Sequence, residues 1–453
     1  MATTRPIAQT TAQAYATVNP DEALQSGDDR YVPLDSARGT NNLAESLCTR
    51  IIAHEENNVP DIYARFLVTG HRGCGKTTEL YRLKDLLAEK HFAVVYFDAE
   101  VELNLQDLKW WNVLIEMVWQ IDEQLSGPPF SLQIPDELRN NAAEWLARVV
   151  TKKTERTDME SSLTTEFGVS AGLPFFAKAK AAIKALVKGS SSTVKEIERE
   201  AERRPPQLYG AVTDLVSHVR RELYEKHRHS SLVVILDGLE KIPLRQVEGG
   251  LTTHNNLFVH NGNHLKAPPC HLVYALPLPL LTSEKIGEVF PTRPFIMPMV
   301  HVRHRDEKED RYALNAMAEV IKRRGSPDLF APGVIKRLVL ASGGHIRDFL
   351  SLVREAASEA EAGARITQAH AKRAIAGLTD LYNRTIQQDF IEPLDYVVQH
   401  NELSGGSHDG ELVNRLLVLE YRNGETWTAL HPCVKETPRY VRAPRARKEE
   451  TSV

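Results

Sequence analysis

The sequence predicts an α/β fold in which a mainly parallel sheet is covered by helices and followed by a helical region. Three observations predict it. Short apolar runs alternate with helical patterns, a glycine-rich motif joins one such run to a helix, and an acid ends another run. Unbroken apolar runs are typical of parallel strands that are buried on both faces.

The expected strands are five short apolar runs. They lie at residues 64–69, 92–97, 232–236, 271–276 and 295–300, and Pro298 weakens the last of them. Helical patterns follow at 77–90 and 107–125. Beyond residue 306 the pattern becomes helical, with expected helices at 307–324, 332–341, 346–360 and 367–383. Gly343 and Gly344 provide a stop between two of these helices, and Thr367 is an expected N-cap.

A chain of 453 residues has room for two to four domains. We expect a flexible N-terminal arm at 1–30 and an α/β core at 31–300, interrupted by an insertion at about 126–205. A helical lid at 301–384 and a C-terminal domain at 385–453, with a basic tail, complete the chain.

Composition excludes several classes of protein. The net charge of −4 does not indicate a globally basic nucleic-acid binder. The four cysteines are scattered without a CxxC pair, which excludes a disulfide framework or a zinc finger and fits a reducing cytosol. The first residues lack the apolar stretch of a secretory signal, and no apolar run approaches the ~20 residues of a membrane span. We therefore expect a cytoplasmic protein without membrane contact.

The motif GHRGCGKT matches the phosphate-binding consensus GxxxxGK[ST] in full, between an expected strand and an expected helix. Its glycines let backbone N–H groups surround phosphate oxygens at a helix N-terminus. Lys76 can reach the β and γ phosphates, and Thr77 can place its hydroxyl on Mg²⁺. The expected nucleotide-binding residues are Gly70, His71, Arg72, Gly73, Cys74, Gly75, Lys76, Thr77 and Thr78.

The acid that such a site needs ends the run LVVILD. Asp237 is expected to hold Mg²⁺, and Glu240, three residues further on, to orient the attacking water. Alternatively, Glu240 is a solvent-facing partner of Lys241.

A third element is the segment SGGHIRDFL, in which an arginine at the start of a lid helix can reach the γ-phosphate. The expected residue is Arg347. The alternative is an exposed helix arginine that pairs with Asp348 or Glu355.

These segments together resemble bacterial AAA+/STAND-type P-loop ATPases related to the origin-recognition/Cdc6-like group. The resemblance runs from about Tyr31 to Pro432 and also includes RYVPLDSARG, VVYFDAE, VVILDGLEK and CHLVYALPLPLL. It implies a P-loop NTPase fold with a helical lid and a winged-helix-like C-terminal module. It further implies ATP and Mg²⁺ as cofactors, and a sensor role for Arg347.

Two departures from the family make slow turnover, or a nucleotide-gated switch, as compatible with the sequence as a motor. The strand at 271–276 ends without the usual polar first sensor, and Gly238 stands where many members carry an acid. Arg303 and Arg305 are candidates for an arginine finger reaching a neighbouring subunit. The alternative is a charged connecting loop.

The segment from Glu411 to Trp427 predicts a helix that runs into a hairpin at Asn423-Gly424. This order resembles a winged-helix module, which binds DNA or protein or packs on the ATPase. The tail RYVRAPRARK is basic and could touch phosphates. The basic helix at 175–188 is expected to pack on the core or a partner rather than lie on a membrane. The histidine pairs 227/229, 260/264 and 301/304 are expected to be surface or loop residues without a metal.

Three functions are compatible with these features. The first is an ATPase switch that couples nucleotide state to oligomerisation or to a separately encoded effector; the resemblance places such switches in bacterial defence against phage. The second is a DNA-binding loader or remodeller, and the third is a scaffold that binds nucleotide without hydrolysing it.

Overall fold

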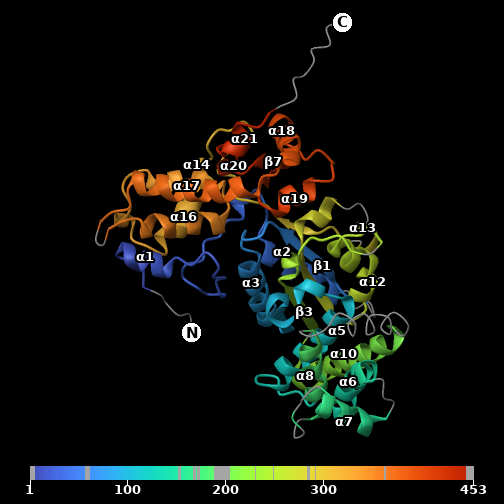
Figure 1. Cartoon of the computed structure of the whole chain (residues 1–453). Helices are drawn as coiled ribbons and strands as arrows, with labels where there is room; N and C mark the ends of the chain where they lie inside the picture. Colours follow the sequence, from blue (N-terminus) through green and yellow to red (C-terminus); the bar gives the residue numbers. More distant parts are fainter. Residues whose placement is uncertain are drawn as a thin grey trace.

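The structure is a computed structural model of the whole chain (Figure 1). It describes residues 6–56, 62–151, 155–166, 170, 174–187, 205–229, 231–247, 249–282, 286–290, 292–361 and 364–444.

A five-stranded parallel sheet lies at the centre of the molecule, with strand order β2-β3-β4-β1-β5. The strands are β1 (Arg65–Gly70), β2 (Ala93–Asp98), β3 (Leu232–Asp237), β4 (His271–Leu276) and β5 (Phe295–Met297). The α/β fold class is thereby confirmed. Strand β5 is shorter than the expected run because it ends before Pro298, which cannot donate to a strand ladder.

Helices cover both faces of the sheet, because successive side chains of a buried strand point to opposite faces. On one face lie α2 (Leu43–Glu56) and α3 (Lys76–Glu89), packed on Phe66, Val233 and Val273. On the other lie α5 (Trp110–Ser126), α10 (Pro205–His227) and the short α12 (Gly262–Leu265).

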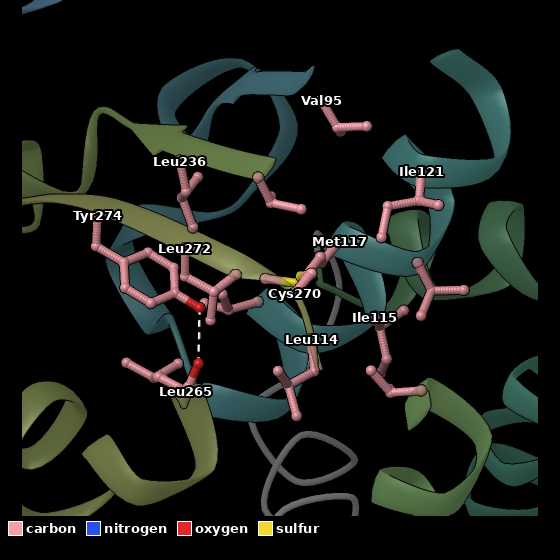
Figure 2. Packing of buried hydrophobic residues seen from close by; sticks show 14 of the residues in the cluster. Val95, Leu114, Ile115, Met117, Ile121, Leu236, Leu265, Cys270, Leu272 and Tyr274 are labelled. Carbon is pink, nitrogen blue, oxygen red and sulfur yellow. Dashed lines mark hydrogen bonds between the residues drawn. The ribbon is translucent and has the colours of Figure 1, made fainter. Parts of the chain in front are cut away.

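Figure 2 shows the second of these cores. Leu236 and Leu272 of neighbouring strands face Leu114 and Met117 of α5. The hydroxyl of Tyr274 donates to the backbone oxygen of Leu265 at 2.8 Å, so the one polar atom of this buried ring is satisfied. At roughly 25 cal/mol per Å² of buried apolar area, such packing is the main stabilising contribution to the core.

The insertion forms a helical bundle at the end of the molecule opposite the C-terminal helices (Figure 1). It contains α6 (Asp136–Thr151), α7 (Arg156–Glu166) and α8 (Phe175–Val187). The basic helix α8 buries Phe175 and Ala179 against α6 and α7, as the packing interpretation expects. No helix in the described part of the chain has the length and apolar character to cross a bilayer.

The region at 301–384, for which we keep the name lid from the expected domain order, contains four helices close to the expected positions. They are α14 (Arg311–Lys322), α15 (Val334–Ser342), α16 (Ile346–Ser358) and α17 (Gln368–Thr385). Thr367 caps α17 by accepting from the N–H of His370, and Gly343 ends α15 in the left-handed conformation with φ 60°. Both boundary predictions are confirmed.

The N-terminal segment differs from the expected flexible arm. Its helix α1 (Thr11–Thr17) packs on α16, with Ala14 and Val18 buried in the core of the lid. Ala8 donates a backbone hydrogen bond to Arg324, and its carbonyl accepts one from Ser326. The small apolar side chains of this polar segment join the hydrophobic core of the lid, a long-range contact that its composition does not reveal.

The C-terminal module contains α18 (Ile391–His400), α19 (Asp409–Asn414), α20 (Pro432–Lys435) and α21 (Pro438–Val441). Between α19 and α20 stands the expected hairpin of β6 (Val418–Asn423) and β7 (Glu425–Leu430), which turns at Gly424. The hairpin packs beside β5, where Met299 donates a backbone hydrogen bond to Glu420. Residues of the basic tail beyond Pro444 lie outside the described residues.

The remaining short helices connect these elements. They are α4 (Ala99–Glu102), α11 (Thr253–Asn255) and α13 (Ile286–Val289).

Candidate functional site

The glycine-rich motif forms a tight loop between the end of β1 and the start of α3. Gly73 and Gly75 adopt φ values of 77° and 105°, which side chains other than glycine rarely tolerate. Gly75 is the N-cap of α3, and no side chain caps the helix there. The N–H groups of the first turn therefore remain available to an anion.

Lys76 is the buried cation of this loop, only 3% exposed. Its ammonium donates to the backbone oxygens of Gly70 and His71, both at 3.0 Å, and lies 3.5 Å from Glu240. Burial alone would lower the pKa of Lys76, but the nearby carboxylate of Glu240 outweighs it and the pKa is raised. Lys76 is thus held charged, on carbonyl partners that phosphate oxygens can replace.

Asp237 ends β3 and is fully buried. Its carboxylate accepts from the Tyr96 hydroxyl at 2.9 Å, from the Gly238 N–H at 2.8 Å, and from Thr77. Burial, with the charge of Glu240, raises the pKa of Asp237 to about 6. The two expected Mg²⁺ ligands, Thr77 and Asp237, are therefore in contact, and a cation beside them would favour the ionised acid.

Glu240 points inward and is 6% exposed. One oxygen faces Lys76, and the other makes no hydrogen bond. The alternative that Glu240 is a solvent-facing partner of Lys241 is wrong, because Lys241 pairs with Asp98 at 3.4 Å and Glu100 at 2.5 Å instead. The unpartnered buried oxygen is suited to orient a water molecule.

Steric crowding explains why residue 238 is a glycine. Its φ is 80°, and a Cβ built there would lie 2.1 Å from a carboxylate oxygen of Asp98. An acid at this position would collide with Asp98, so the carboxylates near Lys76 at the end of β3 are those of Asp237 and Glu240.

Arg347 lies in the first turn of α16, directly against the loop. Its N–H donates to the oxygen of Gly73 at 3.3 Å, and its guanidinium lies 3.2 Å from Asp21 of the N-terminal segment. The expected alternatives, Asp348 and Glu355, are not its partners in the structure. Asp21 instead holds the guanidinium at the edge of the cavity that the loop borders.

That cavity has a volume of about 700 Å³, within the range of small-molecule sites. Residues 72–78 of the loop and the helix start, with Glu240 and Arg347, line one side of it, whereas the expected Gly70 and His71 do not border it. The ring of His71 accepts instead from the N–H of Glu420. The other side is formed by Pro20–Leu24 and Arg30–Asp35, and Leu24 donates its N–H to the Thr78 hydroxyl at 3.2 Å. An uncapped helix start, a buried ammonium and the Thr77 hydroxyl border one cavity, and the buried carboxylate of Asp237 accepts from that hydroxyl; together these groups fit a magnesium nucleotide.

Sequence reasoning missed several residues of this wall. Arg38 is 2% exposed and donates to the backbone oxygen of Cys74 at 2.6 Å. This hydrogen bond stabilises the conformation of the loop. It belongs to RYVPLDSARG, a segment noted only for its resemblance. Tyr96 and Asp21 carried no local signal, because each reaches the site from a distant part of the chain.

A buried cluster of His345, Asp348 and His431 continues from the loop into the lid and the C-terminal module. His345 donates from Nε2 to the oxygen of Arg72 at 2.7 Å, and its Nδ1 lies 3.1 Å from Asp348. The second oxygen of Asp348 lies 3.2 Å from His431 and accepts from Tyr382 at 2.7 Å. We call this the closed cluster.

Charge holds the closed cluster together. Burial would raise the pKa of Asp348, but the two imidazoles outweigh it and hold that pKa well below 3.8. His431 accepts from the Cys433 N–H through Nδ1, and its burial lowers its own pKa. The cluster joins the loop to the residue that follows β7.

Arg303 and Arg305 do not line the cavity. Arg303 donates to the oxygen of Glu307 at 2.9 Å, and Arg305 lies 3.6 Å from Glu425 at the hairpin. Their role toward a neighbouring subunit stays a prediction. The four cysteines are free and buried, as expected for a chain without a disulfide framework.

No protein-family model matches the chain, and no curated protein matches it. The Orc1 protein of Aeropyrum pernix, solved in complex with DNA, aligns over 89% of this chain and 93% of its own, at 13% identity and TM-score 0.33. Cdc6p from Pyrobaculum aerophilum aligns over 93% and 97%, at 10% identity and TM-score 0.35. At these scores the fold class rests on the strand order and loop geometry above.

Proposed function

We propose that this chain binds ATP with Mg²⁺, hydrolyses it slowly, and uses the bound nucleotide to set the position of its lid and C-terminal module. One observation carries the proposal. The backbone oxygens of Arg72 and Gly73 in the loop contact His345 and Arg347 of the lid. A movement of the loop backbone would therefore change these two contacts with the start of α16.

Each residue of the site has a role in this proposal. Lys76 and the first-turn N–H groups of α3 bind phosphate oxygens, and Thr77 and Asp237 hold Mg²⁺. Glu240 orients a water molecule for attack on the γ-phosphate, and Arg347 leaves Asp21 for that phosphate. ATP supplies the phosphoanhydride that is cleaved. The preference for adenine follows the family resemblance.

The switch would act on a partner. The resemblance to STAND-type regulators extends the proposal to a homo-oligomer or a separately encoded effector, in bacterial defence against phage.

Nucleotide binding is tested with a fluorescent ATP analogue. Lys76→Ala should lose binding by more than about 100-fold, since its ammonium is a buried phosphate ligand. Lys90→Ala, at the exposed C-terminal end of the same helix, is the matched control and should bind normally. Equal affinity in both variants would sink the site assignment.

Turnover is tested by steady-state hydrolysis with and without double-stranded DNA. Glu240→Gln should keep binding and lower the rate by about 10²-fold or more. Slow hydrolysis indifferent to DNA supports the switch. Strong stimulation by DNA would replace it with the DNA-remodelling function, and binding without any turnover would replace it with the scaffold.

A further inference from the structure

A second group of histidines lies where the core joins the lid. The chain leaves the core at Val300 and enters α14 after Asp310, and between them it folds back on itself. The backbones of Arg303 and Glu309 pair in an isolated antiparallel β-bridge, and Asp310 donates its N–H to the oxygen of Val302 at 3.0 Å. This fold brings His301, His304 and Asp310 together; we call them the joint cluster.

The three side chains present one donor atom each to a common point. An oxygen of Asp310 lies 3.1 Å from Nδ1 of His301 and 3.7 Å from Nε2 of His304, and all three donors lie within 4.8 Å of one another. Ligands of a tetrahedral zinc ion, at bond lengths of about 2.0–2.1 Å, stand about 3.4 Å apart. The observed spacings bracket that value.

Burial gives the second, independent observation. His301 is only 4% exposed, yet neither of its ring nitrogens makes a hydrogen bond. An unsatisfied buried polar group costs about 1–3 kcal/mol, and native structures keep few of them. Coordination of a cation by Nδ1 removes part of this cost. His301 lies in a loop, as expected, but it is buried rather than on the surface.

Asp310 is also oriented as a ligand. Its other oxygen accepts from the N–H of Ala313 at 3.0 Å and so caps α14. This hydrogen bond fixes the carboxylate and leaves the second oxygen directed at the two imidazoles, as outer-shell partners do for metal ligands. His304 is 43% exposed, so the cluster opens to solvent on its side and a fourth position can take water.

We propose that His301, His304 and Asp310 form a mononuclear Zn²⁺ site with one open position. Two imidazoles and a carboxylate are a ligand set that zinc accepts. The site ties the end of the sheet layer to the first turn of α14, and it therefore stiffens the joint about which the lid would move. It is independent of the nucleotide site, since none of its residues lines the nucleotide cavity.

The test is a Zn²⁺ titration of the purified full chain, stripped with a chelator beforehand, in competition with a chromophoric chelator. The wild type should bind one equivalent that His304→Ala and Asp310→Asn bind at least about tenfold more weakly. Asn is as good an N-cap as Asp, so Asp310→Asn retains the start of α14. The control is His260→Ala, an exposed histidine outside the cluster, which should bind as the wild type does.

Two further readings accompany the titration. Co²⁺ should give the visible absorption of a tetrahedral site in the wild type and not in His304→Ala. Zn²⁺ should raise the melting temperature of the wild type by mass action and leave that of His304→Ala nearly unchanged.

His304 is exposed and its replacement does not disturb the core, so a failure to fold does not cloud the result. Equal Zn²⁺ affinity in the wild type and in both variants would overturn the proposal. So would a wild type that binds no Zn²⁺, which would leave the joint cluster as two histidines beside an aspartate without a metal.

Discussion

The closed cluster and the joint cluster contain the same residue types, two histidines and one aspartate, in different surroundings. Each places one aspartate between two histidines at the boundary of the lid. In the closed cluster the outer ring nitrogens are bonded to the backbone of Arg72 and Cys433. In the joint cluster the outer nitrogen of His301 has no partner and His304 reaches solvent.

The difference shows that residue types alone do not define a site. In the closed cluster, Nε2 of His345 is bonded to the backbone of Arg72 and Nδ1 of His431 to the backbone of Cys433, so neither of these nitrogens is left for a metal. The closed cluster is therefore a structural connection between the loop and the C-terminal module. In the joint cluster the ring nitrogens of His301 make no hydrogen bond, so they can bind a metal, and we therefore assign the zinc to this cluster.

The largest expected effect separates the two aspartates. Asp348→Asn removes the only buried charge between two imidazoles in the closed cluster, so the free energy of unfolding should fall by about 3 kcal/mol. Asp310→Asn should change it by less than about 0.5 kcal/mol without zinc, since the helix cap remains. Urea unfolding with a chelator present measures both. Equal losses would erase the distinction between the clusters.

Acid should destabilise the closed cluster and the buried His71 of the loop next to it. Burial lowers the pKa of His71 to about 3 and also lowers that of His431, while both are near 6.5 in the unfolded chain. The unfolded state then binds more protons below about pH 6.5, so stability is lost as the pH falls from there toward about 3. The free energy of unfolding, measured between about pH 7.5 and 4.5, checks this.

A variant sharpens the acid experiment. His431→Gln should make the loss of stability with falling pH shallower, because one neutral buried imidazole is gone. A curve that is flat for the wild type would contradict the assigned protonation states.

The smallest effect concerns coupling. His345→Gln weakens the hydrogen bond from the lid to the oxygen of Arg72, and should change ATP affinity about fivefold, a typical coupling between sites. It should also remove the ATP-dependent protection of α18–α21 from hydrogen exchange. His260→Gln, an exposed histidine outside both clusters, is the control and should leave both properties unchanged. Full protection in His345→Gln would show that the nucleotide signal does not pass through α16 at this point.

Much of the core was predictable because its signals are local. A strand, a glycine-rich turn and a helix that follow each other within GHRGCGKTTEL determine the loop geometry by their own conformational preferences. The same holds for Asp237, which ends a buried apolar strand, and for the hairpin at Asn423-Gly424.

The sequence by itself therefore determined the fold class, the loop with Lys76 and Thr77, and the acid at the end of β3. Only the tertiary structure decided that Asp21 and Arg38 border the loop, that His345 meets Arg72, and that Glu240 faces Lys76. The physical reason is distance along the chain. Backbone propensity and hydrophobic periodicity act over a few residues, whereas these contacts arise when packing of the sheet and lid brings remote segments together.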